Sequence, residues 1–155
     1  MQSKGFTMNT TTNTTSVIPV IGRVLLAAIF LFSALGKIMA PAATIGYIEA
    51  MGLPLASAGL VLAITVELVG GLMLAVGIKT RAVALGLALF SIVTGLVFHH
   101  GISDQNQLIH LLKNLAMAGG LLQVVAFGAG AYSLDNKSPS LVPPVSGLTN
   151  GHELS

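Results

Sequence analysis

Four long runs of apolar residues with almost no charge dominate this sequence. The runs are residues 20–39, 56–76, 82–98 and a stretch that starts near residue 108 and carries no charge between Lys113 and Asp135. The second run has 21 residues and would rise about 32 Å as a helix, which matches a hydrocarbon core of roughly 30 Å. Because backbone groups in lipid must be hydrogen-bonded within their own segment, we expect four continuous transmembrane helices.

The composition excludes several classes of protein. Hydrophobic residues make up 54% of the chain and charged residues only 8%, whereas a soluble domain is about a quarter charged. The four runs have no polar face to present to water, which excludes a soluble helical protein. A net charge of +2 is far short of a basic surface for a phosphate backbone, so we expect no nucleic-acid partner.

The chain has no cysteine. A disulfide relay, a thiolate nucleophile, an iron–sulfur cluster and a cysteine-ligated zinc are therefore excluded. We expect no intrinsic cofactor from the side chains alone. Any redox chemistry must be carried by a bound cofactor or by a partner.

The two ends of the chain differ in composition from its middle. Residues 1–16 are polar, rich in Thr and Asn and lack an apolar segment, so they do not form a cleavable secretory signal. We predict that they form a disordered tail. Residues 135–155 contain three prolines and predict a second disordered tail. The membrane domain is then expected over residues 17–134.

A shorter segment lies between the first two runs. It is bracketed by Pro41 and Pro54, and Ile45, Ile48 and Met51 fall at helical spacing within it. This pattern predicts a short interfacial helix. The predicted fold is therefore an all-α polytopic membrane protein, a four-helix bundle with an interfacial helix between its first and second spans.

The distribution of Lys and Arg predicts the orientation. With four spans, the N-terminal tail, the loop between the second and third spans and the C-terminal tail share one side of the membrane. That side carries five basic residues, namely Lys4, Arg23, Lys79, Arg81 and Lys137, and the opposite side carries Lys37. We expect Arg23 and Lys37, each near an end of the first span, to extend to the headgroups. The excess of positive charge predicts that both termini are cytoplasmic.

Glu67 lies near the centre of the second apolar run. An ionisable group at that depth costs a few kcal/mol, so it should face the bundle interior with a partner, a proton or both. Ala63, Gly70 and Gly71 share its helical face and would allow a neighbouring helix to approach closely. Two interpretations remain open: a carboxylate that binds a ligand or relays protons, and one that only joins two helices.

Two lysines are candidate partners for Glu67. On the fourth span, His110, Lys113 and Asn114 are spaced i, i+3 and i+4, so they line one stripe. Lys113 lies roughly 7 Å into that span by helical rise, at a depth from which it could reach Glu67. Lys37 on the first span is the alternative partner. We predict an intramembrane polar pocket formed by these five residues: Glu67, Lys113, His110, Asn114 and Lys37.

The loop between the third and fourth spans contains His99, His100 and Asp104. Imidazole and carboxylate groups suit zinc, copper or iron, so these residues are candidate metal ligands. Adjacent histidines cannot both point inward on a helix, however, and the spacing matches no known ligand pattern. Polar residues at the membrane interface are the favoured interpretation, and we predict no metal site.

Several short motifs follow one another along the chain. They are Gly36-Lys37, Gly52-Leu53-Pro54, Glu67-x-x-Gly70-Gly71, Gly77, Thr80-Arg81, Lys113-Asn114 and Gly119-Gly120. Taken in this order, the motifs resemble the DoxX family, and the resemblance extends from Ile18 to Tyr132. It implies a four-helix protein of the bacterial or archaeal inner membrane. Some members are named as subunits of a quinone-linked thiosulfate oxidoreductase or a terminal oxidase, and others as membrane partners of a thiol and superoxide defence complex.

The resemblance and the buried polar residues support three hypotheses. The first is an accessory subunit of a membrane oxidoreductase system that binds a quinone in the polar pocket beside a membrane-bound or peripheral redox protein; any enzymatic activity would then belong to the complex. The second is a non-catalytic scaffold or assembly factor, or a homo-oligomer, that docks helices on its small-residue stripes. The third, ranked last because the chain shows no repeat, is a small proton-coupled transporter.

Overall fold

The computed structural model describes residues 12–137, which form five α-helices and one 3-10 turn. Helices α1, α3, α4 and α5 are long and apolar enough to cross a membrane, α1 through its segment Val17–Met39. This arrangement confirms the predicted all-α bundle of four spans with a short extra helix. The elements are α1 (Thr12–Met39), α2 (Pro41–Ala50), α3 (Ala56–Val76), α4 (Thr80–Phe98), α5 (Gln105–Phe127) and η1 (Asp135–Lys137).

The helix boundaries follow the apolar runs closely, with two informative differences. Helix α3 coincides with the predicted run, and α4 begins two residues before it. Helix α5 begins at Gln105 rather than near Leu108, because the Asp104 side chain accepts hydrogen bonds from the backbone N–H groups of Asn106 at 2.7 Å and Gln107 at 3.3 Å. Such an N-cap satisfies donors that a helix start leaves unpaired. The polar first turn therefore belongs to the helix.

The predicted tails overlap with helical structure at their inner ends. Helix α1 already begins at Thr12, and the turn η1 occupies residues 135–137. The segment that leads into η1 is fixed by contacts with α1 and with the α3–α4 turn, which are described below. The remaining residues of the two predicted tails, 1–11 and 138–155, lie outside the described part of the chain.

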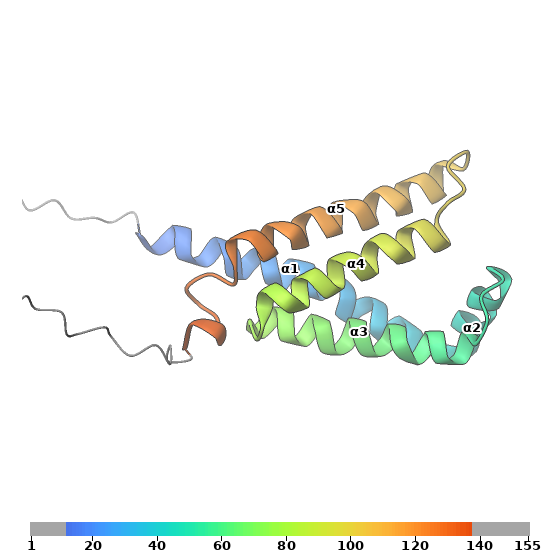
Figure 1. The fold of residues 1–155 in the computed structure, drawn as a ribbon, viewed down its shortest axis with the longest axis horizontal. Coiled ribbons are helices and arrows are strands. Elements are labelled where there is room, and N and C mark those ends of the chain that lie inside the picture. Colours follow the sequence, from blue (N-terminus) through green and yellow to red (C-terminus); the bar gives the residue numbers. More distant parts are fainter. Residues whose placement is uncertain (1–11, 138–155) are drawn as a thin grey trace, which may run out of the picture.

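The four long helices form two antiparallel pairs. Helix α1 packs mainly along α3, and α4 packs mainly along α5, with a smaller contact between α3 and α4. Figure 1 shows the pairs close together near the α3–α4 turn and separating toward the end that carries α2. The described parts of both chain ends lie at the closed end, whereas α2 and the α4–α5 loop lie at the open end (Figure 1).

The interior is small and the outer surface is apolar. Leu74, Leu87 and Leu121 are fully buried where the helices meet, together with several alanines. By contrast, the exposed fraction of Phe32 is 81% and that of Leu25 is 67%. An apolar exterior around a compact interior is expected of helices surrounded by lipid.

Glycines allow the helices of each pair to approach closely. A Cβ atom on Gly71 of α3 would lie 3.0 Å from Leu31 of α1, and one on Gly95 of α4 would lie 2.8 Å from the Cβ of Asn114 on α5. A side chain at Gly95 would have no room, and one at Gly71 would require Leu31 to move, so both glycines favour close approach of the helices. Ala84, Ala88, Ser91 and Gly95 form a stripe of small residues on α4, and all four are buried.

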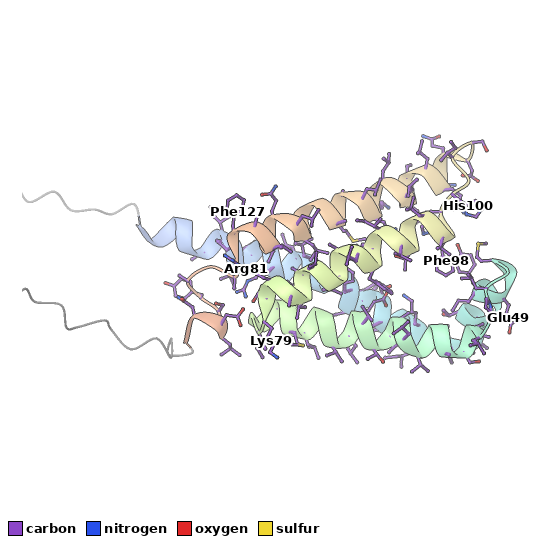
Figure 2. All side chains as sticks on the ribbon, viewed as in Figure 1. Glu49, Lys79, Arg81, Phe98, His100 and Phe127 are labelled. Atoms are coloured by element: carbon purple, nitrogen blue, oxygen red, sulfur yellow. The ribbon has the colours of Figure 1, made fainter. Side chains whose placement is uncertain are left out.

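Helix α2 lies across the open end of the bundle, where the two helix pairs separate (Figure 1). Its Ile48 is buried against Ala56 and Leu60 of α3, as the helical spacing predicted. Its Tyr47 stacks on Phe98 at the end of α4, with ring centroids 5.5 Å apart, and the Tyr47 hydroxyl donates to the Phe98 carbonyl oxygen at 3.3 Å. Phe98 lies at the same end as Glu49 of α2 in Figure 2. Helix α2 therefore connects the two helix pairs.

Candidate functional site

A cavity of about 570 Å³ lies between the helix pairs where they separate. All five α-helices contribute to its walls, and α2 covers one side through Tyr47 and Ile48. The walls are mainly apolar, from residues such as Ile29, Leu62 and Phe90, but several ionisable side chains also line them. A cavity of this size with apolar walls and a few polar groups is typical of sites for small organic ligands.

A buried ion pair forms the polar centre of the cavity. The Nζ atom of Lys37 lies 2.8 Å from each carboxylate oxygen of Glu67 and donates to the Oγ of Ser33 at 2.7 Å. The Ser33 hydroxyl in turn donates to Oε1 of Glu67 at 3.2 Å. The side chain of Glu67 is 7% exposed and that of Lys37 is 23% exposed. All three groups line the cavity, so this ion pair, with Glu67 buried and Lys37 partly buried, borders an open space.

Helix packing decides which lysine pairs with Glu67. Ser33 and Lys37 are one helical turn apart on α1, and α1 lies directly against α3, where Gly71 allows close contact with Leu31. Lys113 is on α5, which packs on α4 instead. Of the two partners that the sequence left open, the structure therefore selects Lys37. Lys113 forms no ion pair with any residue in the described range 12–137.

The stripe on α5 forms the facing wall. His110, Lys113 and Asn114 all line the cavity, as do Lys37 and Glu67, so the five residues of the predicted pocket border one space. The Asn114 Nδ2 atom donates to the backbone carbonyl of His110 at 3.0 Å, which fixes the amide along the helix. His110 and Lys113 are exposed side chains. The α5 wall therefore offers polar groups toward the cavity, opposite the ion pair on α1 and α3.

The three candidate metal ligands near the α4–α5 loop contact different residues. The rings of His99 and His110 stack with centroids 4.9 Å apart, and Nδ1 of His99 lies 2.9 Å from the Gln107 side-chain oxygen. Nδ1 of His100 lies 3.1 Å from the Val97 carbonyl oxygen, and Asp104 caps α5. Residues 12–137 contain no group of three or more His, Asp or Glu side chains that could hold a metal ion. The three candidate ligands thus make different local contacts.

The sequence did not single out two residues that shape this site. Tyr47 and Thr94 both line the cavity. Tyr47 lies on the exposed side of α2, and a single tyrosine in an interfacial segment is more often an interface anchor than part of a site. Thr94 is one of three hydroxyl residues on α4, with Thr80 and Ser91, and its hydroxyl donates to the backbone carbonyl of Phe90 at 2.8 Å. Tyrosine and threonine are ordinary residues in a membrane protein, so the sequence alone does not mark these two positions. Only the arrangement of the helices identifies Tyr47 and Thr94 as part of the site.

The opposite end of the bundle holds a second group of buried polar contacts. Arg23 is 1% exposed, and its Nη2 atom donates to the backbone carbonyl oxygen of Tyr132 at 2.7 Å. The expectation that Arg23 extends to the headgroups is therefore wrong, and it is also wrong for Lys37, whose ammonium pairs with Glu67. The segment after α5 folds back over this arginine, and Gly77 at the end of α3, with φ of +77°, leaves it room. The same end carries the exposed Lys79 and Arg81, labelled in Figure 2.

Asp135 connects the C-terminal segment to α4. Its carboxylate accepts hydrogen bonds from the backbone N–H groups of Lys79 at 2.6 Å and Thr80 at 2.8 Å, at the start of the helix. The hydroxyl and backbone N–H of Thr80, then the N–H of Lys79 and the charge of Arg23, outweigh partial burial and lower the pKa of the Asp135 carboxyl below 3.8. The carboxylate is thus held ionised where the helix dipole favours a negative charge.

Comparisons with known proteins agree with this architecture. The sequence profile of the DoxX family matches residues 18–100. The chain is 37% identical over 115 residues to the inner membrane protein YqjF of Escherichia coli, covering 74% of this chain and 87% of that protein. It is 26% identical over 126 residues to the inner membrane protein YphA of the same organism, covering 78% and 90% of the two chains. No solved structure matches the chain significantly.

The family match extends from the first span to the loop after α4, so it includes Lys37, Glu67 and the helix α2 that covers the cavity. The four apolar helices and the two relatives in the inner membrane agree with this family match. This chain belongs to the DoxX family and is a multi-pass protein of the inner membrane.

Proposed function

We propose that this protein is an accessory subunit of a membrane oxidoreductase system and binds a quinone in the cavity between its helix pairs. The main support for this proposal is a cavity of about 570 Å³. Its walls are mostly apolar, and they also contain the Lys37–Glu67 ion pair and, facing it, a row of polar side chains. A quinone has a flat ring with two carbonyl oxygens and an apolar tail. It therefore needs the same combination of hydrogen-bond donors and apolar surface.

The residues of the α5 wall supply the donors. The Lys113 ammonium and the His110 imidazole border the cavity and can donate to carbonyl oxygens, and the Asn114 amide lies beside them. When bound, a quinone supplies two-electron redox chemistry, which requires protons at its oxygens. The Lys37 ammonium, paired with Glu67 between the helix pairs, is the proton donor nearest to the carboxylate in this cavity. The chain has no cysteine, so electrons must come from a partner protein.

Binding of a quinone analogue to the purified protein tests the proposal. We expect a short-chain quinone to bind in detergent, and Glu67→Gln and Lys113→Met to weaken binding. Arg81→Gln, at the opposite end of the bundle, is the matched control and should bind as the wild type does. If the double variant Glu67→Gln/Lys113→Met binds the analogue with unchanged affinity, the quinone site is not here.

A scaffold function is the alternative, and one observation favours it. Both oxygens of Glu67 are already paired with Lys37, so the carboxylate joins α1 to α3 whether or not a ligand is present. In that case Glu67→Gln should reduce the stability of the bundle or the recovery of a partner protein without changing quinone binding. Co-purification in mild detergent followed by mass spectrometry measures the recovery of a membrane or peripheral redox partner.

We also propose that both termini are cytoplasmic. Lys79 and Arg81 lie at the end of the bundle that holds the described chain ends (Figure 2), and basic residues favour the cytoplasmic side. The cavity would then lie in the periplasmic half of the membrane. A fluorescent protein fused after Ser155 should fluoresce in cells, whereas an alkaline phosphatase inserted in the α4–α5 loop should be active. The reverse pattern would contradict this orientation.

A further inference from the structure

The charges that line the cavity do not cancel. Lys37 and Glu67 neutralise each other at 2.8 Å, and Glu67 is the only carboxylate among the lining residues. Lys113 also lines the cavity and has no ion-pair partner within the described residues 12–137. His99 and His110, at the edge of the same space, can only add positive charge. The lining groups therefore carry a net positive formal charge that no carboxylate among residues 12–137 balances.

Lys113 presents its charge to the open space of the cavity. It lies eight residues after Gln105, the first residue of α5, and thus about 12 Å along the helix, and its side chain is exposed on the cavity wall. Its ammonium is therefore accessible to water, to an opposite charge or to a bound group. Glu67 does not supply the opposite charge, because its carboxylate is paired with Lys37 and forms no ion pair with Lys113.

We infer that the cavity selects a quinone-class ligand whose ring is anionic at neutral pH, such as one with an acidic ring hydroxyl, and that Lys113 provides the counter-charge. This inference rests on the proposed quinone site and specifies which ligands that site prefers. Of the two lysines that line the cavity, Lys37 pairs with Glu67, whereas Lys113 pairs with no carboxylate in the described part of the chain. A charge-assisted hydrogen bond from it is stronger than one to a neutral carbonyl.

The surroundings of Lys113 fit a flat anion with a tail. His110 and Asn114 lie one turn or less from it on the same wall and can donate to further ring oxygens. Apolar side chains of α2 and α4, including Ile48, Phe90 and Val97, line the remainder of the cavity. The ring would therefore lie at α5, and an alkyl chain would extend along α2 and α4.

A matched pair of ligands tests the inference. We compare a 2-hydroxy-3-alkyl-1,4-naphthoquinone, which is ionised at neutral pH, with its neutral 2-methoxy analogue. Binding is measured by isothermal titration calorimetry on the full-length protein in a non-ionic detergent at about pH 7.5, where ordinary histidines are largely neutral. We expect the hydroxy compound to bind about tenfold more tightly, since one charge-assisted contact replaces a neutral one. Lys113→Met should remove this preference, because it weakens binding of the hydroxy compound more than binding of the neutral analogue.

Two further variants serve as controls. Lys113→Arg keeps the charge and should keep the preference, which shows that the site remains folded. Lys79→Met removes a lysine from the opposite end and should change neither affinity. Equal affinity for the two ligands, or a preference that persists in Lys113→Met, overturns the inference while leaving the quinone site in place. If neither ligand binds, the proposed quinone site itself is wrong and the inference falls with it.

Discussion

Arg23 and Tyr132 are 109 residues apart in the chain, yet the guanidinium Nη2 of Arg23 donates a hydrogen bond of 2.7 Å to the backbone carbonyl oxygen of Tyr132. The arginine is 1% exposed, and its Nε and Nη1 atoms have no hydrogen-bond partner among the described residues. The contact holds the segment after α5 against α1. One buried side chain thus links the first helix to the end of the folded domain.

Arg23→Ala should therefore destabilise the closed end of the bundle. The substitution removes a hydrogen bond from a charged group, for which about 1.5–3 kcal/mol is typical, although relief of the buried charge offsets part of the loss. Thermal unfolding in detergent, followed by circular dichroism, measures the effect. Arg81→Ala is the matched control, because Arg81 lies at the same end but is exposed. An equal midpoint for Arg23→Ala and the wild type would contradict a structural role for Arg23.

Asp135 should make stability depend on pH. Its pKa is below 3.8 in the folded protein, so the unfolded chain binds the proton more readily. The stabilisation is thus fully present above the ordinary pKa and is lost as the pH falls through the lower, folded pKa. Asp135→Asn should lower stability by about 1 kcal/mol near neutral pH, as loss of an N-cap does.

The quantity to measure is the difference in unfolding midpoint between the wild type and Asp135→Asn. The other carboxylates titrate in both proteins, so their contribution drops out of this difference. Unfolding midpoints of both proteins are recorded between about pH 7 and about pH 3, and the gap should narrow only at the acidic end. A gap that is constant over the whole range would show that the Asp135 carboxylate charge does not contribute.

The spans could be predicted from the sequence because lipid leaves the backbone few alternatives. Helix α3 has the boundaries of its apolar run, since every polar backbone group in that run must be paired within the helix. The short helix α2 was also predictable, from Ile45 and Ile48 at helical spacing between two prolines. Both predictions rest on local patterns.

The partner of Glu67 could not be predicted in this way. Helical rise gives the depth of Lys113 and Lys37, but it does not say which helices are neighbours. That choice depends on the close approach of α1 and α3 at Gly71. The burial of Arg23 was missed for a similar reason, because its partner is a backbone carbonyl at Tyr132, and no side-chain pattern reveals a carbonyl.

Gly95→Ala should separate α4 from α5. The added Cβ would lie 2.8 Å from the Cβ of Asn114, an atom that moves only with its backbone. Overpacking of this kind costs about 1–3 kcal/mol, and it would also shift Asn114 within the cavity wall. Gly86→Ala on the same helix is the control, because no atom lies within 4 Å of its added Cβ. Stability curves in detergent for the two variants should diverge; if Gly95→Ala is as stable as Gly86→Ala, α4 and α5 are not in such close contact.

A double-mutant cycle on Lys37 and Glu67 measures how far the two residues act as a unit. Lys37→Met leaves the Glu67 carboxylate, 7% exposed, with only the Ser33 hydroxyl, and Glu67→Gln leaves the Lys37 ammonium without its counter-charge. Breaking a buried pair from one side typically costs about 3–5 kcal/mol, whereas removing both charges can be nearly neutral. We therefore expect Lys37→Met/Glu67→Gln to be more stable than the sum of the single effects predicts, by at least about 1 kcal/mol. Unfolding by a denaturing detergent provides the four free energies, and strictly additive effects would show that the two charges do not stabilise each other.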